Sequence, residues 1–123
     1  MPVKSYLAGI KEMLILSAAI QSFEITDEAE EQSYGFIRVK GLTKNSALFE
    51  FFEYVFEETG RVITKDYSFH LQDKNGHLIK RWDNAPHHRD VQTFPHHLHD
   101  GKDVKSSKEM RVKDFIGFLE HNS

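Results

Sequence analysis

The segment from residue 81 to residue 99, RWDNAPHHRDVQTFPHHLH, concentrates side chains that can do chemistry. Five of its residues are histidines, and the tripeptide Pro-His-His occurs twice, at residues 86–88 and 95–97. Imidazole titrates near neutral pH, so it can act as a general acid or base, and it also ligates zinc and other first-row metals. We expect one histidine, His87, to take part in catalysis and four to bind substrate: His88, His96, His97 and His99.

A metal site built from this segment is the less favoured interpretation. The chain has no cysteine and no His-x-x-x-His pair on an expected helix, and adjacent histidines rarely bind one ion together. Asp83, Asp90 or Asp100 could still add a carboxylate ligand. We therefore expect no metal and no cofactor, and a metal-dependent enzyme that uses the histidine-rich segment remains an alternative.

Length and composition predict one small domain that spans residues 1–123. The 16 Lys and Arg residues are outweighed by 19 Asp and Glu residues, for a net charge of −3. This excludes a simple basic coat for nucleic acid, for which a pI above about 9 is expected. No apolar run approaches the roughly 20 residues of a membrane helix. The N-terminus also lacks a signal-peptide pattern, so we expect a cytoplasmic protein without membrane contact.

Hydrophobic periodicity predicts an α+β fold, with a mostly antiparallel five-stranded sheet and a helix near each end of the chain. Apolar residues at spacings of three and four predict the helices, over residues 3–18 and around Val112, Phe115, Ile116 and Leu119. Alternating or aromatic-rich runs predict strands over residues 22–26, 34–42, 47–57, 61–73 and 77–83. We expect the acidic residues 27–31 to form a solvated loop and residues 84–108 to form a long, irregular, histidine-rich loop.

The dipeptide Asn75-Gly76 indicates how the last two predicted strands pair. Asn-Gly is typical of tight hairpin turns, because both residues tolerate a positive φ. A loop of two or four residues places Lys74 opposite His77 and Gln72 opposite Ile79. The same register pairs His70 with Arg81 and Ser68 with Asp83 on one face of the sheet, because side chains alternate along a strand.

A similar turn at Thr59-Gly60 extends the argument to the preceding strand. It places Glu53 opposite Asp66 and Phe51 opposite Ser68, on the same face as His70. Phe52, Tyr54 and Phe56 then belong to the opposite, apolar face. The polar face could be no more than the wet side of an antiparallel sheet, which is a common arrangement. Its mixture of imidazole, guanidinium and carboxylate groups instead favours acid–base chemistry near a bound anion.

Several of these segments together resemble the TumE family of toxins. The resemblance is carried by Arg81-Trp82-Asp83-Asn84-Ala85-Pro86-His87-His88 and by Thr93-Phe94-Pro95-His96-His97-Leu98-His99. The segments 67–78 and 53–55 are also similar, and one departure is the aliphatic Leu71, where relatives often have a larger aromatic residue. The resemblance implies a toxin of a type II toxin–antitoxin module, with a cognate antitoxin that has a helix-turn-helix DNA-binding domain. It also implies interference with RNA or translation.

We therefore expect a toxin that resembles a metal-independent ribonuclease, alone as a homodimer or in a hetero-oligomer with its antitoxin. In such RNA cleavage a base removes the 2′-OH proton, an acid protonates the leaving oxygen and a cation stabilises the charge on phosphorus. His70 or His87 would be the base or acid, Arg81 the cation, and Asp83 would orient an imidazole. Glu53, on the expected polar face, would contact substrate. A non-catalytic inhibitor that binds a translation component is a further alternative.

Overall fold

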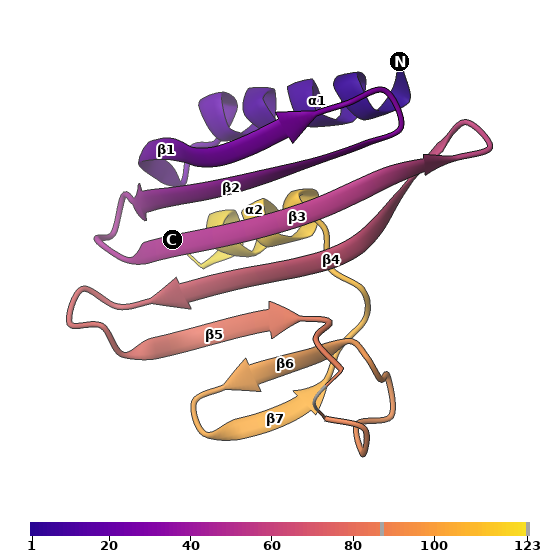
Figure 1. Cartoon of the computed structure of the whole chain (residues 1–123). Coiled ribbons are helices and arrows are strands. Elements are labelled where there is room, and N and C mark those ends of the chain that lie inside the picture. The colour runs from indigo at the N-terminus through magenta and orange to yellow at the C-terminus, as the bar shows by residue number, and fades with distance from the viewer. Residues whose placement is uncertain (87, 123) are drawn as a thin grey trace.

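The computed structural model describes residues 1–86 and 88–122. Within these ranges a seven-stranded antiparallel sheet is preceded in the chain by one helix and followed by another (Figure 1). The strands follow one another in chain order across the sheet. The elements are α1 (Pro2–Leu16), β1 (Ile20–Glu30), β2 (Tyr34–Thr43), β3 (Leu48–Glu58), β4 (Arg61–Gln72), β5 (Leu78–Asp83), β6 (His97–Asp100), β7 (Asp103–Ser106) and α2 (Val112–His121). The predicted α+β class and terminal helices are confirmed.

The prediction of five strands and a long irregular loop is wrong, because part of that loop forms β6 and β7. These two strands have four residues each and are joined by a turn at Gly101, which has a positive φ of 63°. Their sequences are largely polar, so their periodicity is weak. They form strands because β6 pairs with the free edge of β5, where unpaired backbone groups would otherwise need water. Irregular backbone remains over residues 84–96, within the described part of that segment.

The acidic residues 27–30 are also a strand and not the solvated loop predicted from their charge. They continue β1, which is an edge strand and pairs only with β2 among the described strands. Charged side chains are common on edge strands because they discourage pairing with other chains. One of them, Glu28, is held by Lys11 of α1 at 3.0 Å.

The register of the β4–β5 hairpin is confirmed at the positions that matter for chemistry. His70 pairs with Arg81 and Ser68 pairs with Asp83. The loop itself is longer than predicted, because the Asp73 carboxylate accepts hydrogen bonds from the backbone N–H groups of Asn75 and His77. This loop leaves Gln72 opposite Leu78, and a bulge at Ile79 then restores the predicted register. The predicted pairs Gln72–Ile79 and Lys74–His77 are wrong.

The predicted register of the β3–β4 hairpin holds only near its turn. A bulge at Lys65 shifts the rest, so Glu53 pairs with Tyr67 and Phe51 with Phe69, where Asp66 and Ser68 were predicted. A one-residue shift turns every later side chain to the other face of the sheet. As a result Phe51 and Glu53 are buried on the core side. Phe52, Tyr54 and Phe56 lie on the other face, which reverses the prediction for all five residues.

The hydrophobic core lies between the sheet and both helices, which pack on the same face (Figure 1). Phe115 of α2 is at its centre, with ring contacts at 5.3 to 6.2 Å from Phe49, Phe51, Phe69 and Trp82. The opposite face of the sheet is called the open face below. Neither helix in the described residues combines the length and the apolar character needed to cross a membrane.

Candidate functional site

Two rows of side chains cross the open face, because the strand registers bring them opposite one another. The first row is Lys40, Glu50, His70, Arg81 and His99. The second row is Arg38, Phe52, Ser68, Asp83 and His97. Directly opposed side chains have Cβ atoms about 4.5–5.5 Å apart, so neighbours within a row can touch. The rows therefore bring residues from five strands, β2 to β6, into one polar site.

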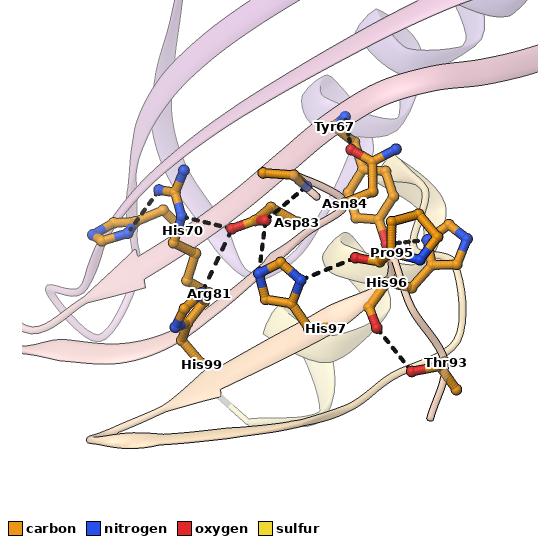
Figure 2. A network of polar contacts seen from close by, with 11 residues as sticks. Tyr67, His70, Arg81, Asp83, Asn84, Thr93, Pro95, His96, His97 and His99 are labelled. Atoms are coloured by element: carbon orange, nitrogen blue, oxygen red, sulfur yellow. Dashed lines mark hydrogen bonds and ion pairs between the residues drawn. The ribbon is translucent and has the colours of Figure 1, made fainter. Parts of the chain in front are cut away.

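Asp83 is the hub of this site, and its side chain is largely buried. Its Oδ1 atom accepts a hydrogen bond from the Ala85 backbone N–H at 3.0 Å and lies 2.9 Å from Nε2 of His97. Its Oδ2 atom accepts from Nε of Arg81 at 3.2 Å and lies 3.7 Å from Nε2 of His99. Figure 2 shows the carboxylate between these groups. One carboxylate thus fixes the relative positions of a guanidinium and two imidazoles.

His97 is the most deeply buried member of the site, with 1% of its surface exposed. Its Nδ1–H donates to the carbonyl oxygen of Pro95 at 2.9 Å, so Nδ1 carries a proton. The contact between Nε2 and Asp83 then needs a second proton, shared between the ring and the carboxylate. His97 and Asp83 therefore share a buried proton, and the same carboxylate also contacts Arg81 (Figure 2).

Arg81 connects the buried pair to His70. Its Nη1 atom lies 3.4 Å from Nδ1 of His70, and Nε2 of His70 donates to the side-chain oxygen of Gln72 at 2.9 Å. The Gln72 oxygen requires a proton on Nε2, which leaves the lone pair of Nδ1 directed at the guanidinium. No residue in the described ranges accepts a hydrogen bond from Nη2 of Arg81. That nitrogen is available for an anion.

His99 occupies the other side of Arg81 and favours its neutral form. Partial burial is the main cause that lowers the pKa of His99 below the ordinary 6.5. The Asp83 carboxylate opposes this effect, while His97, His88 and Arg81 add to it. An imidazole that stays neutral at pH 7 can accept a proton from a substrate.

His88 completes a triangle of imidazoles with His97 and His99. The ring centroids are 4.9 Å apart for His88 and His97, 5.4 Å for His88 and His99, and 4.9 Å for His97 and His99. Their possible ligand atoms all lie within 4.8 Å of one another. Among the described residues this is the cluster that could hold a metal ion. Three histidines of the histidine-rich segment, His88, His97 and His99, thus lie together next to Asp83 and Arg81.

A hollow of about 350 Å³ lies beside the first row, toward β2. Its lining includes Arg38, Lys40, Glu50, Ser68, His70 and Arg81. Three of these residues, Arg38, Lys40 and Glu50, were missed in the sequence. The sequence could have indicated these residues only if the bulge at Lys65 had been predicted, because that bulge brings Glu50 opposite His70.

The predicted place of Glu53 on the polar face is wrong, because its side chain is fully buried in the core. There it accepts hydrogen bonds from the hydroxyl groups of Tyr6, at 2.8 Å, and Thr64. Burial raises the pKa of Glu53, which the two hydroxyl groups and the Arg111 charge partly offset. Burial, together with the Glu53 charge, also raises the pKa of Tyr6. Glu53 is thus a structural carboxyl group on the far side of the sheet from His70.

One other predicted site residue, His96, is not part of the cluster. His96 turns away from Asp83 and contacts Tyr67, with 2.9 Å between Nδ1 and the phenolic oxygen and the rings stacked at 5.8 Å (Figure 2). Burial raises the pKa of Tyr67 to about 12. His96 therefore fastens residues 93–97 to the sheet, and we find no contact from it to the two rows among the described residues. His87 lies outside the described residues.

The comparisons with known proteins agree with the resemblance to the TumE family that the sequence shows. The model of the family described as Toxin TumE matches residues 10–122, a range that includes every strand, α2 and about half of α1. Neither a curated protein nor a solved structure matches the chain significantly. Because the family model covers far more than half of the sequence, the chain belongs to the TumE toxin family.

Proposed function

We propose that this TumE-family toxin cleaves RNA by metal-independent acid–base catalysis at the first row of the open face. The observation that carries the proposal is the order of His70, Arg81 and His99 on three adjacent strands. Two imidazoles flank a guanidinium whose Nη2 has no acceptor among the described residues. The strands of the two imidazoles lie roughly 9.5 Å apart, which is two strand spacings. A phosphodiester bound to Arg81 would be within reach of both imidazoles.

The chemistry then follows from the state of each group. His99, whose pKa is lowered, removes the proton from the ribose 2′-OH, and the 2′-oxygen attacks phosphorus. The bond between phosphorus and the 5′-oxygen breaks as His70 gives a proton to that oxygen. For this step His70 must first take up a proton on Nδ1, whose lone pair faces Arg81 in the structure. The products are a 2′,3′-cyclic phosphate and a 5′-hydroxyl group, and both histidines have exchanged protonation states.

Arg81 and Asp83 support this reaction without exchanging protons with the substrate. The guanidinium offers its outer nitrogen to the phosphoryl oxygens, where negative charge builds up in the transition state. Asp83 holds Arg81 by its Nε atom, so the side chain is fixed before substrate arrives. Asp83 also lies beside His99 at 3.7 Å and stabilises the imidazolium form that follows proton transfer.

The proposal is tested by the ends of the cleaved RNA. Untagged protein, dialysed against EDTA, is incubated with total bacterial RNA, and the product ends are identified. We expect cleavage in the presence of EDTA, with 2′,3′-cyclic phosphate and 5′-hydroxyl ends, and no cleavage of an all-DNA copy of a cleaved sequence. Absence of cleavage would contradict the proposal, and so would 5′-phosphate ends that require an added metal ion.

A second candidate, a metal-dependent enzyme, is supported by the triangle of His88, His97 and His99. The hydrogen bond from Nδ1–H of His97 to the Pro95 carbonyl is the kind of contact that orients a metal-binding histidine. Asp83, next to His97 and His99, would provide an oxygen ligand. The Arg81 charge, bound to the same carboxylate at 3.2 Å, opposes a cation there. For this reason we favour the metal-independent mechanism.

The two candidates are separated by a metal analysis of protein purified without a histidine tag. Stoichiometric zinc or another transition metal, lost in a His88→Ala variant together with RNA cleavage, would establish the metal-dependent enzyme. Protein that contains no bound metal and keeps its activity in EDTA would exclude it. His77→Ala is the matched control, because His77 lies in the exposed β4–β5 hairpin loop away from the triangle.

Membership of the TumE toxin family implies a cognate antitoxin. We further propose that this antitoxin carries a helix-turn-helix DNA-binding domain and that the toxin acts on RNA in the cytoplasm. A helix-turn-helix reading frame next to the toxin gene, whose product copurifies with the toxin, would support this. Size-exclusion chromatography with light scattering distinguishes a toxin homodimer from a hetero-oligomer.

A further inference from the structure

We propose that aromatic side chains on the open face of β2 and β3 form a platform on which the bases of single-stranded RNA stack. The platform consists of Tyr34 and Phe36 on β2 and of Phe52 and Tyr54 on β3. The choice of RNA as the occupant rests on the proposed function. The platform itself follows from the bulge at Lys65, which turns Phe52 and Tyr54 away from the core.

The four rings form one connected surface. Tyr34 and Tyr54 are 5.9 Å apart with planes inclined by 11°, and Phe36 and Tyr54 are 6.3 Å apart with planes inclined by 12°. Phe36 also contacts Phe52 at 5.9 Å. Tyr34 is 39% exposed, and the other three rings are partly exposed.

Nothing in the described fold explains this exposure by packing. Both helices cover the other face of the sheet, and the described irregular residues 84–86 and 88–96 lie between β5 and β6 in the chain, away from β2 and β3 (Figure 1). A contiguous group of exposed rings on a monomer usually marks a binding surface, because leaving it in water loses hydrophobic free energy. Aromatic rings on an open sheet are a recurrent means of binding single-stranded RNA, since every base has a face that stacks.

Positive charges accompany the rings at the positions that a phosphate backbone would need. The Arg38 guanidinium lies 4.7 Å from the centre of the Phe52 ring, and Lys65 Nζ lies 5.8 Å from the centre of the Tyr54 ring. Lys40 follows Arg38 on the same face of β2. Charge complementarity therefore favours a polyanion over an uncharged partner.

Acidic groups on the same face limit the path that the RNA can take. Glu50 is paired with Arg38 at 3.5 Å, and Asp66 lies opposite Tyr54 on β4. On the far side of β2, Asp27 and Glu24 of β1 lie opposite Arg38 and Lys40. The acidic β1 would repel a phosphate backbone, so the RNA is expected to leave the platform toward β4 and β5.

That direction leads into the catalytic row. The hollow that contains His70 and Arg81 is also lined by Arg38, whose guanidinium lies over the Phe52 ring, so the hollow adjoins the platform. Bases stacked on Phe52 and Tyr54 would place the next phosphates of the strand in this hollow. The platform thus predicts a preference for single-stranded RNA, because paired bases cannot stack on protein rings.

The test is direct binding of a fluorescein-labelled 2′-O-methyl oligouridylate of about 12 nucleotides, a length within the site sizes of single-strand binding proteins. Methylation removes the 2′-OH nucleophile, so fluorescence anisotropy measures binding without cleavage. We expect Phe52→Leu and Tyr54→Leu each to raise Kd by about tenfold, within the range for loss of one base–ring stack. Tyr54→Phe should bind like the unmodified protein, because it keeps the ring.

Leucine is chosen because it preserves apolar contacts with neighbouring side chains while removing the aromatic face. The matched control is Ile15→Ala, an exposed apolar residue of α1 on the other side of the molecule, which should leave Kd unchanged. Thermal melting establishes that each variant is folded, and Tyr34→Leu serves as the replacement for a variant that is not. A folded Leu variant with unchanged Kd would overturn the proposal.

Two further outcomes are decisive. Duplex RNA that competes as well as the single strand would contradict stacking. Leu variants that keep their RNA affinity but no longer bind antitoxin would make this surface a protein interface instead. Failure of the proposed function gives a different result. A protein that binds the oligonucleotide through these rings but cleaves no RNA would support the platform and contradict the catalytic mechanism.

Discussion

Asp83 determines the electrostatics of the site at the scale of single residues. It is bound at once by the imidazole of His97, the guanidinium of Arg81 and a backbone N–H group, and it lies close to His99. The sequence predicted its place opposite Ser68, and its role of orienting an imidazole remains a prediction. Its buried partner could not be foreseen, because His97 reaches Asp83 only through the β5–β6 pairing. The adjacent His96 was equally hard to place: its side chain contacts Tyr67, whereas that of His97 contacts Asp83.

The first prediction concerns the titration of His99. Because burial lowers its pKa, we expect His99 to titrate below 6.5, as measured by NMR of the imidazole Cε1–H group. On the acidic side, RNA cleavage should fall as pH drops through the His99 pKa, since the base must be neutral. Arg81→Gln should raise this pKa, because the guanidinium charge lowers it. A His99 pKa above 6.5 in the unmodified protein would contradict this account.

The second prediction concerns Glu53, whose pKa is raised by burial. In the window between 4.5 and the raised pKa, the folded protein binds the proton and the unfolded chain does not. The free energy of unfolding should therefore fall as pH rises through this window, by about 1.4 kcal/mol per pH unit. Chemical denaturation should show this dependence in the unmodified protein and not in Glu53→Gln.

The control for Glu53 is Glu50→Gln, which changes a half-exposed carboxylate on the open face. That variant should keep the pH dependence of the unmodified protein. If Glu53→Gln also keeps the pH dependence of the free energy of unfolding, the carboxyl group of Glu53 does not cause it, and the prediction is wrong.

At the scale of elements, two β-bulges decide which residues reach the site. The bulge at Ile79 compensates for the long hairpin loop, so the predicted pair of His70 and Arg81 is correct although the loop length is not. The bulge at Lys65 has no such compensation, so Glu53 and Phe52 exchange faces relative to the prediction. Neither bulge has a sequence signature of its own. The bulge at Lys65 is favoured by the burial that it permits, because it lets Phe51 and Phe69 pack against Phe115.

The third prediction tests the close approach of β2 to the core. A Cβ atom at Gly41 would collide with the ring of Phe49 and would lie 2.8 Å from the carbonyl oxygen of Ser22. We expect Gly41→Ala to lower the free energy of unfolding by about 1–3 kcal/mol, as for other overpacked sites. Urea denaturation measures the change.

Gly9→Ala is the control, because a Cβ atom there meets nothing within 4 Å and Gly9 lies inside α1. This substitution should instead stabilise the protein by about 0.5–1 kcal/mol, since glycine is a poor helix former. A Gly41→Ala variant as stable as the unmodified protein would show that β2 can move away from Phe49.

At the scale of the whole molecule, the division of the sheet into two faces links fold to function. The sequence predicted the α+β class, both terminal helices and the pairing of the central hairpin, because these depend on local periodicity and one turn. It did not predict β6 and β7, whose weak pattern is stabilised by pairing with β5. Without β6, His97 and His99 could not be placed beside Asp83 and Arg81. The aromatic platform was also not predicted, since the register expected from the Thr59-Gly60 turn placed Phe52 and Tyr54 on the apolar face.

The central claim is that the row of His70, Arg81 and His99 carries out RNA cleavage. It is tested most directly by measuring the rate of RNA cleavage, and growth arrest after induction, for His70→Ala and Arg81→Ala beside the exposed-loop control His77→Ala. We predict that both site variants are folded and soluble, lose at least about 10²-fold in cleavage rate and no longer arrest growth. His77→Ala should behave like the unmodified protein. Full cleavage and full toxicity in folded His70→Ala and Arg81→Ala would contradict the account.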